Sequence, residues 1–350
     1  MTLDTVETET ARVNVSSRSH IEVKRSLLRL RRGEGRPVLG MEHTTMLGAT
    51  QRRGAVVLVH GLAQNHRTWR TEQRSFVAML AARGYEVYNL DLRGHGWSRR
   101  FGAPAARSVR DYVDDVVDLV EELPEPAFVI GHSLGAAVGV LSSFEVKLRG
   151  LVHIGGLYTF GGHSRWIRAV SGATLALTKL IPSDMHVNAR GFGQLLGRRV
   201  RLVDRAWALL PHSGWSTGSM EYEQLTERLD EGFDRSSLAI WKEMSGWAHH
   251  GGIDPTGKAA EMDAPLLVVT GARDDLAHPQ DGKALFDATG TDDATYVKFT
   301  EQNHGYAPGH LDIILGSQAV EVVWPVIADW LDQRSTAAPV IEAASIPRAG

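Results

Sequence analysis

The stretch Gly131-His132-Ser133-Leu134-Gly135 sets one serine between two glycines, after an apolar run at residues 127–130 and before the small residues Ala136 and Ala137. A serine in this pattern is typical of a tight turn from a strand into a helix, where its hydroxyl projects above the sheet. The glycines are needed because a side chain at either position would collide with neighbouring backbone. The flanking strand and helix patterns favour a nucleophile over an idle serine in a turn.

A serine hydroxyl becomes a useful nucleophile only when a histidine accepts its proton, and that histidine needs a carboxylate to orient it. With a serine at such a turn, the acid and then the histidine follow it in the chain. Two carboxylates, Asp274 and Asp275, come directly after the apolar run at residues 265–270. Two histidines, His304 and His310, come after the next run. The residue pattern alone leaves both choices open.

The oxyanion formed by serine attack needs two backbone N–H donors. Leu134, directly after the serine, is expected to supply one donor, and Leu62, directly after His60-Gly61, is expected to supply the other. We interpret His60 as a brace for its loop and not as a proton-transfer group.

Alternating strands and helices must position these residues. Apolar runs of strand length occur at residues 55–59, 85–90, 127–130, 151–154, 265–270 and 294–299. Helical spacing separates most of them, clearest at residues 108–123, where Ser108 and Asp111 form a capping box, and also at residues 69–83. This alternation predicts an α/β fold with a mostly parallel central sheet covered by helices on both faces.

The alternation of strands and helices is interrupted at residues 157–262, which show helical patterns and no convincing strand. Helical spacing occurs there at residues 166–180 and 196–210. We predict a helical cap, or lid, at residues 157–262 inserted into a core of residues 23–156 and 263–334, with flexible tails at 1–22 and 335–350. Five tryptophans of the lid could line a substrate cavity, although packing is the commoner role of such residues: Trp166, Trp207, Trp215, Trp241 and Trp247.

The composition excludes several function classes. The 350 residues carry a formal net charge of -3, which argues against a nucleic-acid binder, and the absence of cysteine excludes disulfides, thiolate metal sites and cysteine nucleophiles. No secretory signal pattern and no apolar run of membrane-spanning length is seen, so a cytoplasmic location is the default expectation. The basic stretch at residues 24–36 could touch acidic lipid head groups transiently, and the alternative is a solvated pair of strands. The oligomeric state is left open.

The chain resembles the α/β-hydrolase superfamily over roughly residues 23–334. Four stretches are more narrowly similar to its esterase and acid-lipase-like branch: HGLAQNHRTW, LAARGYEVYNLDLRGHGWS, GARDDLAHPQD and GHLDIILGSQA. The resemblance implies that Asp274 is the acid and His310 the base, with His304 as the alternative base. The chain departs from the pattern at Leu134, where lipases often have glutamine, and this argues against a lipase in the narrow sense.

These observations lead to the hypothesis of a serine hydrolase with the triad Ser133, Asp274 and His310, acting on a small-molecule carboxylic ester that is hydrophobic and lipid-like. Leu62 and Leu134 would form the oxyanion hole, and no metal or organic cofactor is required. The resemblance also implies that epoxide hydrolases and dehalogenases carry aspartate at the position of Ser133, which argues against both. An acyltransferase with the same triad is the alternative. A non-catalytic binding protein for a small ligand is the third hypothesis.

Overall fold

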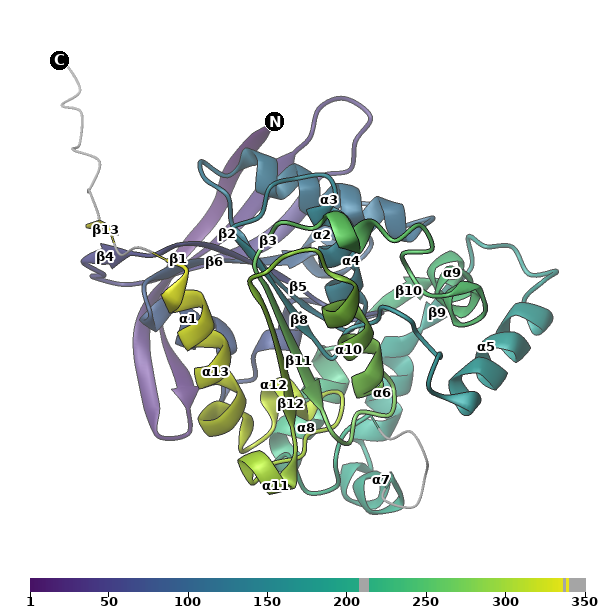
Figure 1. The fold of residues 1–350 in the computed structure, drawn as a ribbon. Coiled ribbons are helices and arrows are strands. Elements are labelled where there is room, and N and C mark those ends of the chain that lie inside the picture. The colour runs from purple at the N-terminus through teal and green to yellow at the C-terminus, as the bar shows by residue number, and fades with distance from the viewer. Residues whose placement is uncertain (208–213, 336–337, 340–350) are drawn as a thin grey trace.

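The computed structural model describes residues 1–207, 214–335 and 338–339. Nine strands form one sheet in the order β1-β2-β3-β6-β5-β7-β8-β11-β12 (Figure 1). Their bounds are β1 Thr2–Ser16, β2 Ser19–Arg31, β3 Leu39–Met46, β5 Gly54–Val59, β6 Tyr85–Asp91, β7 Phe128–His132, β8 Gly150–Ile154, β11 Leu266–Gly271 and β12 Ala294–Phe299. From β6 to β12 every neighbouring pair is parallel, whereas β1, β2 and β3 are antiparallel additions. The predicted α/β fold with a mostly parallel sheet is confirmed.

Helices cover both faces of the parallel part because its strands are apolar on both sides. Successive residues of β5, such as Val56 and Val57, belong to the two opposite cores. One core is covered by α3 (Val109–Glu122), α4 (Leu134–Ser143) and α10 (Pro279–Ala288), and the other by α1 (Phe76–Ala82) and α13 (Ala319–Gln333). The two layers lie on either side of the sheet in Figure 1. Strands buried on both faces thus explain the continuous apolar runs in the sequence.

Two local expectations for helices have different outcomes. The capping box of Ser108 and Asp111 is present at the start of α3. The helix expected over residues 69–83 starts only at Phe76, where Ser75 caps α1. The residues before it form the 3-10 helix η1 (His66–Trp69) and a short bridge between Arg70 and Ser75. The side chain of Ser75 accepts a hydrogen bond from the N–H of Ala78, and this cap fixes the later start.

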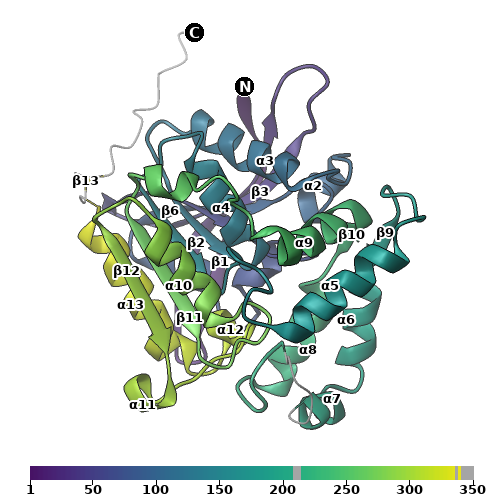
Figure 2. The same cartoon turned by 45° about the vertical axis from the view of Figure 1, so that its right-hand side comes forward.

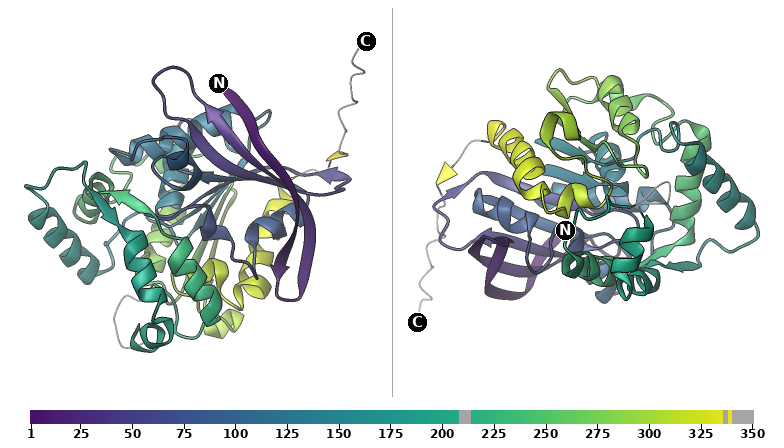
Figure 3. Two further views of the ribbon diagram at one scale, coloured as in Figure 1. Left: turned by 180° about the vertical axis from the view of Figure 1, so that it is seen from behind. Right: turned by 90° about the horizontal axis from the view of Figure 1, so that it is seen from below.

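The prediction of a flexible tail at residues 1–22 is wrong, because these residues contain β1 and the start of β2. The two strands pair along almost their whole length, from Thr2 opposite Arg31 to Ser16 opposite Ser19, and Figure 3 shows this long hairpin at the edge of the sheet. Most side chains of β1 are exposed. The segment is therefore ordered by backbone hydrogen bonds and by the high strand propensity of its threonines. It buries few apolar side chains, and for that reason the sequence pattern did not indicate a strand.

Residues 157–262 are mainly helical and lie to one side of the sheet (Figure 2). Their elements are α5 Arg165–Leu177, β9 His186–Asn188, α6 Ala189–Gly197, α7 Val200–Trp207, α8 Tyr222–Glu231, β10 Arg235–Ser237, α9 Leu238–His250 and η2 Lys258–Glu261. The antiparallel pair β9 and β10 was not expected from the sequence. The stripe expected over residues 196–210 is split between the end of α6 and α7, and its last member, Leu210, lies outside the described residues.

The remaining elements are short: β4 Gln51–Arg52, β13 Ala338–Pro339, α2 Gly96–Arg100, α11 Glu301–His304 and α12 Asp312–Leu315. Strand β13 pairs with β4. Apart from Ser335 and this strand, the expected C-terminal tail at 335–350 lies outside the described residues. Within the described ranges, no helix has the length and apolar character needed to cross a membrane.

Candidate active site

Ser133 lies at the turn between β7 and α4 with a strained backbone. Its φ is +58° and its ψ is -122°, and it is one of two non-glycine residues with positive φ among those described. Glycine is required on both sides of the serine. A Cβ on Gly131 would lie 2.3 Å from the carbonyl oxygen of Gly135, and a Cβ on Gly135 would lie 2.2 Å from that of Val59. The tight turn expected from the sequence is therefore present, and close backbone packing enforces it.

His310 and Asp274 meet although 36 residues separate them in the chain. Asp274 follows β11, and its Oδ2 accepts a hydrogen bond from Nδ1 of His310 at 2.8 Å. The other carboxylate oxygen accepts from the backbone N–H groups of Leu276 and Ala277 at 3.0 and 2.8 Å. Asp274 is 1% exposed and His310 is 5% exposed. With Nδ1 donating to the carboxylate, Nε2 of His310 is left free as a proton acceptor.

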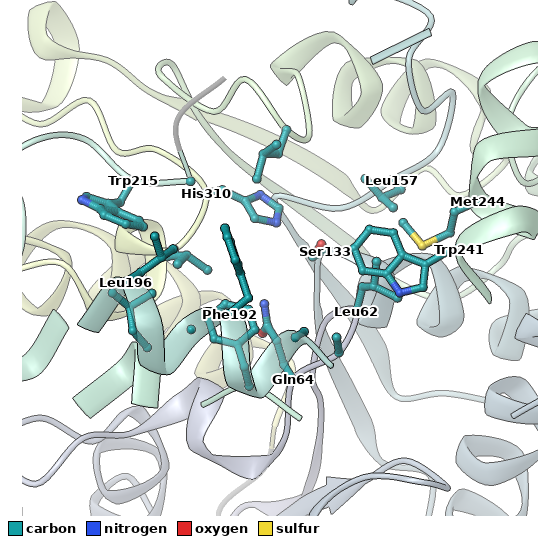
Figure 4. Close-up of a pocket in the computed structure, with 18 of the residues that line it drawn as sticks. Leu62, Gln64, Ser133, Leu157, Phe192, Leu196, Trp215, Trp241, Met244 and His310 are labelled. Atoms are coloured by element: carbon teal, nitrogen blue, oxygen red, sulfur yellow. The ribbon is translucent and has the colours of Figure 1, made fainter. Parts of the chain in front are cut away.

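Ser133 and His310 both border one cavity, into which the serine oxygen and the imidazole are directed (Figure 4). No hydrogen bond joins the two side chains in this structure. Such bonds are often long in free enzymes and tighten when substrate is bound. Asp274, His310 and Ser133 are thus brought to one end of the sheet, as parallel strands require when their carboxyl ends carry the functional loops.

The other candidate base, His304, and the other candidate acid, Asp275, lie outside the cavity lining. His304 is on α11, where its Nδ1 accepts from the N–H of Thr300 at 3.4 Å and its ring packs on Phe299. The pairing of His310 with Asp274 agrees with the choice that the family resemblance implied.

Leu62 and Leu134 are the two residues expected from the sequence to donate to the oxyanion. Leu62 borders the cavity beside Ser133, and Leu134 is the first residue of α4. Among the described residues, no acceptor takes the N–H of either leucine, so both amides are free to donate. The helix that starts at Leu134 also presents its positive end to this point. The arrangement can stabilise a negative oxygen near Ser133.

His60 braces the loop that carries Leu62. Its Nδ1 donates to the carbonyl of Gly61 at 2.9 Å and its Nε2 accepts from the N–H of Leu92 at 3.1 Å. Burial lowers the pKa of His60 to about 3. The imidazole is therefore neutral, and both of its nitrogens are used in holding the backbone, as we interpreted from the sequence.

Two residues that support the site were missed in the sequence. His132, next to Ser133, donates from Nε2 to the carbonyl oxygen of His310 at 2.9 Å, and burial keeps its pKa well below the usual range. Gly155 has a φ of +47°, and a Cβ there would lie 3.0 Å from Oδ2 of Asp274. His132 occupies the variable position of the serine motif. Its position next to the nucleophile is therefore the only sequence signal that could have indicated a supporting role.

The cavity has a volume of about 390 Å³ and is mostly apolar. Several of its walls come from the helical segment 157–262, namely Ile167, Phe192, Leu196, Leu229, Trp241 and Met244. Trp215 and Trp241 line it, whereas Trp166 is 56% exposed and Trp247 packs against the core. The side chain of Trp207 lies outside what the structure describes. Of the tryptophans considered as cavity-lining residues in the sequence, some therefore line the cavity and others do not.

No group of three or more histidine, aspartate or glutamate side chains in the described ranges is arranged to hold a metal ion. The groups that the structure brings together at the cavity are a hydroxyl, an imidazole bonded to a carboxylate, and backbone amides. These are the groups of acyl transfer through a serine.

Comparison with known proteins identifies the family of the chain. A family model described as "Alpha/beta hydrolase family" matches residues 56–322. Epoxide hydrolase B of Mycobacterium tuberculosis is 30% identical over 141 residues, which cover 40% of this chain and 37% of that protein. The chain thus matches little more than a third of that relative's length. Monoacylglycerol lipase of Mycolicibacterium smegmatis is 25% identical over 255 residues, 70% of this chain and 78% of the lipase.

Among solved structures, a soluble variant of monoglyceride lipase from Saccharomyces cerevisiae, in complex with a substrate analog, superposes with a TM-score of 0.61. The alignment covers 88% of this chain and 95% of that one at 15% sequence identity. At this identity the likeness establishes a common fold and nothing about substrate.

Proposed function

The chain belongs to the α/β hydrolase family, and on that premise we propose that it is a serine hydrolase that cleaves carboxylic esters through an acyl-enzyme on Ser133. One observation carries the proposal. The His310 imidazole, bonded to Asp274 at 2.8 Å, borders the same cavity as the Ser133 hydroxyl. Esterases and lipases among the relatives support a hydrolase, and the identity of the nucleophile is our inference from the site.

In the proposed reaction, Nε2 of His310 accepts the proton of the Ser133 hydroxyl as the oxygen attacks the ester carbonyl. The tetrahedral oxygen accepts hydrogen bonds from the N–H groups of Leu62 and Leu134. His310 then gives its proton to the leaving alcohol, and an acyl-enzyme remains on Ser133. Water, deprotonated by His310, releases the acid. Asp274 orients the imidazole and stabilises its positive charge throughout.

We propose a hydrophobic ester as substrate and residues 157–262 as a lid over it. The apolar walls supplied by that segment support both proposals, because an apolar cavity of this size favours an acyl chain or another bulky apolar group over a charged one. The same proposal includes a division of the chain into this lid and a core of residues 1–156 and 263–334, with the β1–β2 hairpin counted in the core.

The test is labelling and turnover with one preparation of the full chain. Wild-type protein should react with a fluorophosphonate probe and hydrolyse nitrophenyl esters of increasing chain length, and Ser133→Ala should do neither. A wild-type protein that turns over an epoxide such as styrene oxide but no ester would contradict the proposal. Release of the acid with water alone identifies a hydrolase, whereas acyl products formed only with added alcohol or thiol would identify an acyltransferase instead.

A further inference from the structure

Arg228, on α8 of the proposed lid, is a buried cation without a carboxylate partner. It is 3% exposed, and it takes part in no ion pair with the described residues. Its Nη1 is buried and has no hydrogen-bond partner there. Burial lowers its pKa to about 10, so the guanidinium is still charged at neutral pH. A buried cation without a carboxylate partner is costly to keep, so the groups that Arg228 does contact are of interest.

The hydrogen bonds of Arg228 lead to Gln64, the residue two positions after Leu62. Nη2 of Arg228 donates to Oε1 of Gln64 at 2.9 Å, and the hydroxyl of Thr68 donates to the same oxygen at 2.8 Å. Arginine can only donate, so the oxygen of the Gln64 amide must face Arg228 and its NH2 group must face the other way. Gln64 is 4% exposed, and its orientation is therefore fixed.

The NH2 group of Gln64 faces the cavity beside Ser133. Gln64 borders the cavity, and Figure 4 shows the nitrogen end of its side chain directed into the space that Ser133 and His310 share. Ser133 and Gln64 both lie close to Gly61. A Cβ placed on this glycine would lie 3.0 Å from Cβ of Ser133 and 3.3 Å from Nε2 of Gln64. No described acceptor takes the N–H groups of this amide.

The same lid segment also holds the backbone of the loop. The N–H of Asp234 donates to the carbonyl of Ala63 at 2.7 Å, and Asn65 donates from Nδ2 to the carbonyl of Glu231 at 2.9 Å. Ala63 has a φ of +54°, the second strained non-glycine residue of the described chain. Contacts from residues 228–234 therefore fix the loop that carries both Leu62 and Gln64.

We propose that Gln64 is a third, side-chain donor to the oxyanion formed on attack by Ser133, and that Arg228 is the positioning residue that holds it. This inference rests on the proposed ester hydrolysis. The amide NH2 group adds a hydrogen bond to those from Leu62 and Leu134, and the nearby guanidinium charge favours negative charge on the substrate oxygen. Both contributions act in a mostly apolar cavity, where electrostatic stabilisation is stronger than in water.

The test compares Gln64→Met with the wild-type protein on one nitrophenyl ester. Methionine has a similar length and volume but no donor, so the fold should be kept, which the melting temperature checks. We expect kcat/KM to fall about 10- to 100-fold, less than the full effect of a main oxyanion donor. The affinity for an alkyl trifluoromethyl ketone, which forms a tetrahedral oxyanion on serine, should fall by a similar factor.

Arg228→Met should lower kcat/KM to a similar extent, and the double variant should be no more than about twofold worse than the weaker single variant, because Arg228 acts through Gln64. Arg67 offers a matched control. It forms ion pairs with Glu227 and Glu231 of the same helix from the outside. Arg67→Met should leave kcat/KM within about twofold of wild type.

Two results overturn the role of Gln64. The first is a folded Gln64→Met variant with wild-type kcat/KM. The second is a loss confined to KM, with unchanged affinity for the trifluoromethyl ketone. A wild-type protein inert to both esters and fluorophosphonates would instead overturn the proposed function and this inference with it, so the two failures are distinguishable. Gln64→Met decides the question even if Arg228→Met does not fold.

Discussion

The imidazole of His132 donates a hydrogen bond to the backbone carbonyl of His310 at 2.9 Å, and the two rings lie 4.7 Å apart. This contact joins the residue before the nucleophile to the residue that we propose as its base. Because burial keeps His132 neutral, it can donate without adding a charge beside the catalytic imidazole. The relative position of Ser133 and His310 therefore depends on a neighbour that takes no part in proton transfer.

Replacing His132 by phenylalanine should test this contact. His132→Phe keeps an aromatic ring but loses the donor, so we expect kcat to fall about 2- to 10-fold, the effect of one neutral hydrogen bond. Single-turnover acylation measures it. His43→Phe is the control, since His43 also has a lowered pKa but stacks on Tyr88, on β3 and outside the cavity lining. Equal rates for both variants and wild type would show that the contact has no catalytic effect.

His310 and His304 should differ sharply when each is replaced by alanine. His310→Ala removes the proton acceptor, and turnover should fall by about 10⁴-fold or more. His304→Ala removes a packing contact with Phe299 and the long hydrogen bond from the N–H of Thr300, both outside the cavity lining, and we expect turnover within about threefold of wild type. Fluorophosphonate labelling rates give an independent readout. Loss of labelling in His304→Ala alone would mean that the base is His304.

Asp274→Asn should lower kcat by about 10³-fold, somewhat less than loss of His310, because the amide can no longer fix and charge-stabilise the imidazole in the same way. Asp275→Asn is the matched control, since Asp275 is adjacent in sequence, whereas the hydrogen bond to His310 is made by Asp274. Steady-state kinetics on one ester measures both variants. Comparable losses in the two variants would contradict the assignment of the acid.

Ester turnover should fall at acid pH. A histidine base acts only when neutral, so its protonation at acid pH removes activity. We therefore expect kcat/KM to fall by about tenfold or more between neutral pH and pH 4. A pH profile on an uncharged ester provides the measurement. A rate that stays flat down to pH 4 is incompatible with a histidine base.

Asp312 should make folding stability depend on pH through the loop that carries His310. Its Oδ1 accepts from the N–H groups of Gly309 and Ser216 at 3.0 and 3.3 Å, and burial raises its pKa to about 6. A carboxyl with a raised pKa in the folded state holds its proton there, and this stabilisation is lost as pH rises from about 4 through 6.

Asp312→Asn keeps an oxygen for both N–H groups and does not titrate. The free energy of unfolding of the variant should therefore rise relative to that of wild type between pH 5 and pH 8, by on the order of 1 kcal/mol. Urea unfolding at the two pH values measures this difference. If the difference between the proteins is the same at both values, the buried carboxyl does not act in this way.

The sequence alone determined the parallel core and the turn at Ser133, because both rest on local chemistry. Apolar runs of strand length specify strands buried on two faces, and two glycines around a serine specify a turn that no other residue pair allows. The antiparallel hairpin β1–β2 escaped prediction because its strand β1 is held by backbone pairing and buries few side chains. The late start of α1 was not predicted, because a single capping serine within an apolar stripe hardly changes the helical periodicity of that stripe.

The residue pattern alone left open which acid meets which histidine. The family resemblance implied Asp274 and His310, and the tertiary structure shows that contact and the side chains around it. Asp274 and Asp275 are equivalent in the chain, and so are His304 and His310, until folding turns one of each pair toward the other. The contact of Arg228 with Gln64 joins residues 164 positions apart. Such contacts depend on where the helices of residues 157–262 pack against the core, and no local pattern of residues records that distance or direction.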